Sequence, residues 1–423
     1  MDPVEKKRTI KNLGYLSISK VLIYLLSIIT ITLIPRYLGV VGYGQLNFVL
    51  SFIGIFVIFG DLGINTLIFR DVSKNPSLRN KYFNNLFLPK LLLLFIVSLL
   101  MIVISFFLDK PLVVKQMIFL GLFFILFHFG ANTISKTLAS LQLFKYQAYQ
   151  EFLSKLFYTV FALLVIYFNQ GLLGIFLSQI IAYFIVFIFL IIVIRKYVKL
   201  DLKLNNSFFI EKLKYSWPFA LAAIFSTIFF NFDKLFISLI KDDYQLGLYA
   251  VGVTFVGFLI TIISVFGIIL FNLLSKYSFK KESLPIFNKF LKISLIIGFP
   301  IFFGGIFLSK DIILLLFGSE YVLGSISFAI LLFFFLVLSV NNIFTQYLYS
   351  HNFEKYMLKI RGVATGINVV LNLIFIPFFG IIGAAITTVI SEIIVFIFNY
   401  RKIKTKVGFT FFKPFYRILL SSI

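Results

Sequence analysis

The sequence has no cysteine and only two histidines, His128 and His351. The lack of cysteine excludes disulfides, iron–sulfur clusters and thiol nucleophiles. Two histidines are too few for a zinc site made by the protein alone, so we expect no metal and no cofactor. No loop carries the glycine pattern that cradles nucleotide phosphates, and no loop is long enough for a separate catalytic domain. We therefore expect that the protein is not an enzyme and is not by itself an ATP-driven pump.

Charge is also scarce. Only 13% of the residues are charged and 61% are hydrophobic, whereas about a quarter of the residues of a soluble domain are charged. The apolar residues form long runs of about 20, the length of helix that crosses a hydrocarbon core. The sequence thus predicts an all-α polytopic membrane protein. Twelve spans are predicted, at residues 13–35, 46–69, 86–108, 117–139, 152–168, 172–194, 217–240, 247–275, 291–308, 326–349, 361–379 and 381–400.

The basic residues are unevenly distributed. There are 39 Lys and Arg against 16 Asp and Glu. Counted from the N-terminus, alternate extramembrane segments hold 29 of the 39, and the segments between them hold 5. By the positive-inside rule, this pattern places both termini in the cytoplasm. We expect a multi-pass protein of the cell (inner) membrane. Orientation accounts for the net charge of +23, so no nucleic-acid partner is expected.

The most polar connection, residues 195–216, divides the spans into six and six. Both halves then enter the membrane with the same orientation, as in parallel repeats. We predict an N-terminal lobe at 1–206, a C-terminal lobe at 207–400 and a basic tail at 401–423. The tail is either an interfacial segment or the start of a further helix.

Seven of the twelve predicted spans carry polar residues at helical spacing, on one face. Such faces are predicted to meet around a hydrated cavity between the halves, as in a transporter; the alternative is tight helix packing. The faces are Ser17, Lys20, Tyr24, Ser27; Asn47, Ser51, Gly54, Asp61, Asn65; His128, Asn132, Ser135; Thr227, Asn231, Lys234, Ser238; Asn342, Thr345, Tyr349; Arg361, Thr365, Asn368, Asn372; and Thr388, Glu392, Asn399.

Charged residues within spans usually face a cavity or a partner. Lys20 and Lys234 can line a cavity or extend their ammonium groups to the membrane surface. Asp61 and Glu392 are candidates for binding a coupling ion, and Asp233 for either a functional role or pairing with Lys234. Three further basic residues near the cytoplasmic side, Arg70, Lys90 and Arg361, are either orientation anchors or ligands for a headgroup.

Short motifs in a fixed order resemble the polysaccharide-transport family of oligosaccharide flippases. The first span ends in Pro35-Arg36-Tyr37-Leu38-Gly39, followed by Gly42-Tyr43-Gly44. Gly60-Asp61-Leu62-Gly63 lies in the second span, and Ser216-Trp217-Pro218 opens the seventh. Phe232-Asp233-Lys234 and Gly247-Leu248-Tyr249 follow. The family comprises Wzx-like O-antigen translocases, in the superfamily that also holds the multidrug and toxin extrusion exporters.

The resemblance implies two six-helix lobes in a V and alternating access. It implies as partners membrane lipids, glycan polymerase and ligase machinery, and a substrate in which an isoprenoid pyrophosphate carries an oligosaccharide. Basic residues would hold the pyrophosphate through charge-assisted hydrogen bonds. The candidate substrate-binding residues are Lys20, Tyr24, Asp61, Asn231, Asp233, Lys234, Arg70, Lys90, Arg361 and Asn368, and the candidate ion-coupling residues are Asp61 and Glu392.

Three other functions remain open at this point. A cation-coupled drug or solute exporter of the same fold would need acids inside the membrane, which Asp61, Asp233 and Glu392 supply. A polymerase or ligase of surface glycans would need a large outer loop, and the predicted outer loops are short. A purely structural role would leave the seven polar faces unexplained.

Overall fold

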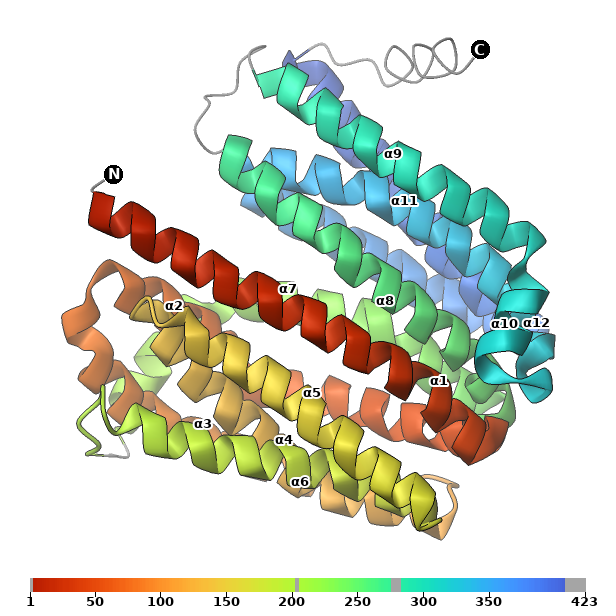
Figure 1. The fold of residues 1–423 in the computed structure, drawn as a ribbon, viewed down its shortest axis with the longest axis horizontal. Helices are drawn as coiled ribbons and strands as arrows, with labels where there is room; N and C mark the ends of the chain where they lie inside the picture. The colour runs from red at the N-terminus through yellow and green to blue at the C-terminus, as the bar shows by residue number, and fades with distance from the viewer. Residues whose placement is uncertain (1–2, 202–204, 275–282, 408–423) are drawn as a thin grey trace. The chain divides into compact units, whose positions relative to one another are not determined.

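The computed structural model describes residues 3–201, 205–274 and 283–407, and in these ranges the regular structure is helical, with no strand (Figure 1). The chain divides into two compact units, residues 1–227 and 228–423. Unit 1 contains α1 (Pro3–Asp61), α2 (Ile64–Lys74), the 3-10 helix η1 (Pro76–Leu78), α3 (Arg79–Phe106), α4 (Leu112–Ser140), α5 (Phe144–Tyr167) and α6 (Gly171–Ile194). Helix α7 (Asn206–Ile240) runs across the division. Unit 2 contains α8 (Asp243–Leu274), α9 (Leu284–Phe307), α10 (Ser309–Phe317), the 3-10 helix η3 (Ser319–Gly324), α11 (Ser325–Ser350) and α12 (Glu354–Val407).

Ten helices of the described chain are long and apolar enough to cross a membrane. Two of them, α1 with 59 residues and α12 with 54, are far longer than one span requires, since a helix rises about 1.5 Å per residue and the core is about 30 Å thick. Each is interrupted by a glycine with non-helical backbone angles, Gly39 in α1 and Gly380 in α12. Each therefore supplies two spans, and the predicted all-α polytopic fold of about twelve spans in two lobes is confirmed.

The second span differs from the prediction of one helix over 46–69. Helix α1 ends at Asp61, and Leu62 and Gly63 follow with φ of 44° and 75°. A Cβ on Gly63 would lie 2.8 Å from Ser216 O on α7, so only glycine fits there. The Ser216 hydroxyl also donates a hydrogen bond to Leu62 O at 2.8 Å. Two of the sequence motifs thus meet, and α7 fixes the break between α1 and α2.

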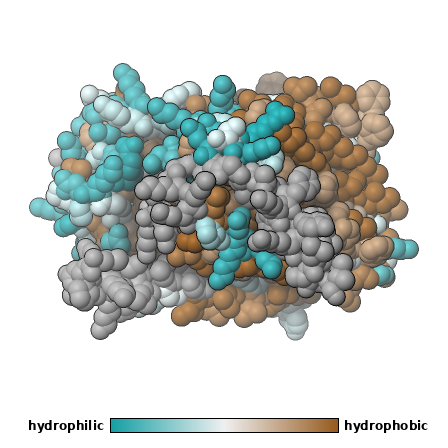
Figure 2. All heavy atoms as spheres, turned by 90° about the horizontal axis from the view of Figure 1, so that it is seen from above, coloured by the Kyte–Doolittle hydropathy of each residue, from teal (hydrophilic) through white to brown (hydrophobic). Residues whose placement is uncertain are grey.

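Each unit has its own apolar core. In unit 1, Ala131, Ile134 and Leu138 of α4 pack with Val186 and Leu190 of α6. In unit 2, the core joins α8, α9, α11 and α12 around Phe287, Phe344 and Tyr347. Many large apolar side chains remain exposed. The face drawn in Figure 2 separates into a hydrophilic zone and a hydrophobic zone. Both observations are expected for a surface that lies partly in lipid. Residues 408–423, most of the predicted basic tail, lie outside the described residues.

Candidate functional site

Unit 1 contains an open pocket of about 370 Å³ among α1, α4, α5 and α6, which we call the unit 1 cavity. Its lining residues are mostly polar or aromatic, although the surrounding helices are strongly apolar. They are Lys20, Ile23, His128, Gln150, Glu151, Ser154, Lys155, Tyr158, Gln179 and Tyr183. A cavity with these groups can hold a charged, hydroxyl-rich ligand.

The charges of the unit 1 cavity are predominantly positive. Lys20 Nζ lies 2.7 Å from Glu151 Oε2, and both side chains are partly exposed, at 40% and 26%. Lys155 Nζ donates to Thr30 Oγ1 at 2.6 Å and contacts no carboxylate in the described chain. Lys136 lies within electrostatic reach of Lys20 and Glu151. Two lysines in the lining against one carboxylate, with a third lysine nearby, favour an anionic ligand.

The same cavity offers aromatic and amide groups. The His128 ring packs edge-on against Tyr183, with 4.3 Å between ring centroids. Buried His128 Nδ1 has no hydrogen-bond partner in the described part of the chain. Gln150 and Gln179 add amide donors and acceptors to the wall. Such groups are suited to hydrogen bonds with sugar hydroxyls.

Lys20, Tyr24 and His128 were predicted as members of polar helix faces, whereas the lining residues of α5 were not. Tyr24 lies on α1 within electrostatic reach of Lys20 and Glu151. Gln150, Glu151, Ser154, Lys155 and Tyr158 occupy one face of α5. Gln150, Ser154 and Tyr158 follow one another at intervals of four residues, as do Glu151 and Lys155, so this helical face could be read from the sequence. It was missed because the predicted span 152–168 left out Gln150 and Glu151, and because Lys155, although inside that span, was counted among the cytoplasmic basic residues.

Asp61 and Lys90 form a second polar cluster in unit 1. The Lys90 ammonium is 1% exposed and pairs with the Asp61 carboxylate. It also donates to Asn65 Oδ1 at 2.7 Å and to Thr133 Oγ1 at 2.8 Å. The cluster joins the end of α1 to α2, α3 and α4, so in this structure Lys90 contacts protein groups rather than lipid headgroups.

Arg70 lies apart from both clusters. Its Nε donates to Asp71 Oδ1 at 2.7 Å, and its guanidinium lies 5.4 Å from the centroid of the Phe219 ring. Burial raises the pKa of Asp71, but hydrogen bonds from Arg70 and Tyr82 outweigh burial and the net shift is downward. Arg70 therefore contacts α7 through Phe219 and pairs with Asp71 on its own helix, α2.

In unit 2, the buried carboxylate of Glu392 is the centre of a polar cluster. Arg361 Nη1 donates to Glu392 Oε2 at 2.9 Å, and Asn341 Nδ2 of α11 donates to Glu392 Oε1 at 2.6 Å. Glu392 is 0% exposed. Both carboxylate oxygens are thus occupied by donors from the protein. Of the other predicted residues nearby on α12, Asn368 accepts from Asn372 Nδ2 at 3.1 Å.

Asp233 occupies a different environment in unit 2. Its Oδ2 accepts a hydrogen bond from the Tyr249 hydroxyl at 2.6 Å, and its Oδ1 accepts one from the Lys234 backbone N–H at 2.8 Å. The Lys234 ammonium instead contacts Asn231 Oδ1 at 3.4 Å. Asp233, Tyr249 and Thr388 line a small cavity of about 60 Å³. Asp233 thus accepts its hydrogen bonds from neutral donors and has Lys234 within electrostatic reach, whereas Asp61 and Glu392 each form a direct ion pair.

Comparisons with known proteins agree with this architecture. A family model described as "Polysaccharide biosynthesis protein" matches residues 9–278, and one described as "Lipid II flippase MurJ" matches residues 246–423. No curated protein matches significantly.

Two solved structures share the fold. One is the lipid II flippase MurJ in an inward closed conformation, with a TM-score of 0.74, 16% identity, and coverage of 92% of this chain and 87% of that chain. The other is an inward-facing multidrug resistance MATE family transporter of the MOP superfamily, with a TM-score of 0.70, 12% identity, and coverage of 90% and 94%. The first family model covers more than half of the sequence. The chain belongs to the family of polysaccharide biosynthesis proteins, and it shares its fold with a lipid II flippase and a MATE family transporter.

Proposed function

We propose that the protein is a flippase that moves an isoprenoid-pyrophosphate-linked oligosaccharide from the cytoplasmic to the outer leaflet by alternating access, for surface polysaccharide such as lipopolysaccharide O-antigen. The observation that carries the proposal is the unit 1 cavity, which combines lysines with amides and tyrosines inside an apolar helix bundle. Family membership and the likeness to a lipid II flippase support it. Both termini are proposed to be cytoplasmic, and glycan polymerase and ligase machinery would use the product.

Lys20 and Lys155 are the proposed ligands of the pyrophosphate in unit 1. Charge-assisted hydrogen bonds from ammonium groups to phosphate oxygens are among the stronger polar contacts. Lys20 is already paired with Glu151, but the pair is partly exposed, and such pairs contribute only about 0–1 kcal/mol. Replacing Glu151 by a phosphate oxygen as the partner of Lys20 therefore costs little free energy, and so does the reverse exchange when the substrate leaves. Reversible exchange suits a transporter, which must release its substrate.

The glycan is proposed to contact the neutral groups of the unit 1 cavity. Gln150 and Gln179 can each donate and accept hydrogen bonds, as sugar hydroxyls require. Tyr158 and Tyr183 present ring faces and hydroxyls. In unit 2, Lys234 and Asn231 are retained as proposed contacts. Lys90 and Arg361 are proposed to act by holding Asp61 and Glu392 in place.

A cation-coupled exporter remains the second candidate, and one observation favours a coupling role for Asp233. Asp61 and Glu392, the residues predicted for coupling, are already neutralised by Lys90 and Arg361. Asp233 lines a small cavity with hydroxyl groups of Tyr249 and Thr388. Oxygen ligands of this kind suit a proton or a small hard cation. We propose that coupling, if present, uses Asp233.

The test uses a cell that lacks this protein and makes the glycan only when the protein is supplied. Lys20→Ala and Lys155→Ala should abolish surface glycan and leave protein abundance unchanged, with lipid-linked glycan accumulating on the cytoplasmic side. Lys115→Ala, in the first turn of α4 and outside the lining of the unit 1 cavity, is the matched control. Normal surface glycan with both cavity variants would overturn the role of the cavity. Drug resistance without any effect on glycan would favour the exporter.

A further inference from the structure

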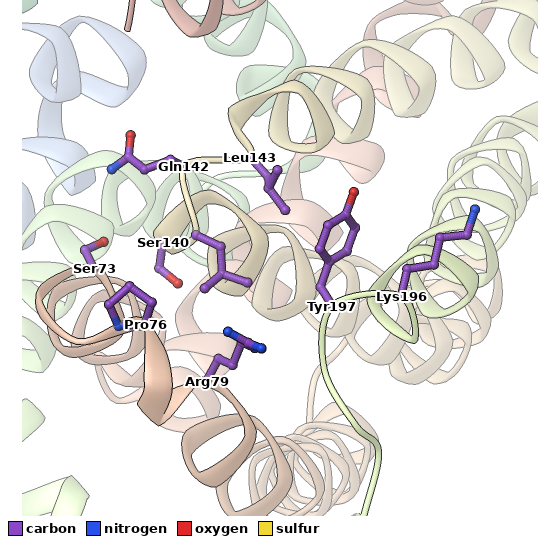
Figure 3. A pocket seen from close by; sticks show the side chains of 9 residues that line it. Ser73, Pro76, Arg79, Ser140, Gln142, Leu143, Lys196 and Tyr197 are labelled. Atoms are coloured by element: carbon purple, nitrogen blue, oxygen red, sulfur yellow. The ribbon is translucent and has the colours of Figure 1, made fainter. Parts of the chain in front are cut away.

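Unit 1 has a second, larger hollow, of about 450 Å³, that the proposed transport function does not use. It lies where the connections α2–α3 and α4–α5 and the end of α6 come together, and we call it the turn pocket (Figure 3). Its polar lining residues are Ser73, Arg79, Ser140, Gln142, Lys196 and Tyr197. All three connections belong to the basic segments that the sequence predicts to be cytoplasmic.

The charge of the turn pocket is entirely positive. Arg79 and Lys196 line it, and none of its lining residues is an acid. The nearest acid along α2, Asp71, is occupied by Arg70 and Tyr82. Within the described part of the chain, no carboxylate therefore neutralises the two cations of this pocket.

Two donors of the turn pocket are also unsatisfied. Arg79 Nε and Ser73 Oγ are shielded from solvent and have no hydrogen-bond partner among the described residues. Leaving a buried donor unpaired costs free energy, most of all when the group is charged. In Figure 3 the Arg79 guanidinium lies between the side that holds Ser73 and the side that holds Tyr197. Arg79 is thus a cation of the lining whose Nε has no acceptor among the described residues.

We propose that the turn pocket binds a phosphate group. A phosphate offers several acceptor oxygens and a negative charge, matching the Arg79 guanidinium and the Ser73 hydroxyl. Lys196, whose side chain points away from Arg79 in Figure 3, adds a second positive charge to the lining. Basic pockets between helices on the cytoplasmic side of a membrane bind the headgroups of anionic lipids. The phosphate can therefore belong to a lipid headgroup or be free in the cytoplasm. The inference rests on unit 1 alone and does not depend on the transported substrate.

The test measures binding to the purified full-length protein. Native mass spectrometry would titrate phosphatidylglycerol and phosphatidylcholine with identical acyl chains, and calorimetry would titrate inorganic phosphate. The double variant Arg79→Gln/Lys196→Gln is compared with Lys74→Gln/Arg195→Gln, which removes two exposed basic residues nearby that do not line the pocket. Lys196→Gln alone serves if the double variant does not purify as a single species.

The two sources give different results. For a lipid phosphate, the wild type prefers phosphatidylglycerol, the pocket variant loses about tenfold in affinity, and the control changes less than twofold. For a free phosphate, inorganic phosphate binds and shows the same loss while the two lipids bind alike. Equal binding of every ligand by the wild type and the pocket variant would overturn the proposal.

Discussion

Arg361 Nη1 lies 2.9 Å from Glu392 Oε2, and this ion pair links the two halves of α12 on either side of Gly380. The carboxylate is fully buried, and Asn341 of α11 occupies its other oxygen. A buried carboxylate whose two oxygens already accept from Arg and Asn is a structural group in this arrangement. Glu392 was predicted as an ion-coupling residue and Arg361 as a substrate-binding residue, and the structure brings the two together as partners of one ion pair.

Removing one member of this pair should destabilise the protein more than removing both. Arg361→Gln leaves the buried Glu392 charge without its cation, which costs about 3–5 kcal/mol in fully buried pairs and less here, because Arg361 is 30% exposed. Thermal unfolding in detergent should show a clear drop in midpoint, and Arg361→Gln/Glu392→Gln should recover part of it. Arg401→Gln, an exposed residue late in α12, is the control. Additive effects of the two single substitutions would contradict the coupling.

The two glycine breaks should be sensitive to alanine. Gly39 has φ 67° and ψ 175°, and Gly380 has φ 54° and ψ −132°, backbone regions that cost a residue with a Cβ about 1–3 kcal/mol. At Gly380 a Cβ would also lie 2.5 Å from Gln245 Oε1. Both substitutions should lower the unfolding midpoint. Gly366→Ala, also in α12 but with nothing within 4 Å of its Cβ, should leave the midpoint unchanged or raise it.

Much of this architecture follows from the sequence because apolar run length and charge asymmetry are local properties. The spans predicted at 172–194 and 326–349 nearly coincide with α6 and α11. The break after Asp61 could not be predicted, because it depends on the approach of α7 to Gly63. The partners of the charged residues within the spans could not be predicted either. Lys20 pairs with Glu151 and Lys90 with Asp61, each on another helix, and residue spacing along one helix does not specify such pairs.

Asp233 should control any dependence of transport on a cation gradient. Asp233→Asn retains the size of the side chain and its hydrogen bond from Tyr249 but removes the negative charge that would bind a proton or Na⁺. In vesicles with imposed gradients, the wild type should respond to one of these gradients and the variant should not. Asp311→Asn, an exposed acid at the start of α10, should behave as the wild type does. A gradient response that survives in Asp233→Asn would exclude this residue as the coupling group.

The orientation can be tested directly because the chain has no cysteine of its own. Single cysteines at Gln170, in the α5–α6 connection, and at Arg195, after α6, are both exposed. With the termini in the cytoplasm, a membrane-impermeant maleimide should label Gln170→Cys in intact spheroplasts and Arg195→Cys only after lysis. The reverse pattern would invert the predicted topology.

The central claim is that this protein carries a lipid-linked glycan across the bilayer. The most direct measurement is the rate at which a fluorescent isoprenoid-pyrophosphate oligosaccharide crosses the membrane of vesicles that contain only the purified protein. We predict rapid crossing with the wild type and with Lys115→Gln, and at least tenfold slower crossing with Lys20→Gln or Lys155→Gln. Crossing by the wild type at the rate of protein-free vesicles, or equal rates for all variants, would contradict the account.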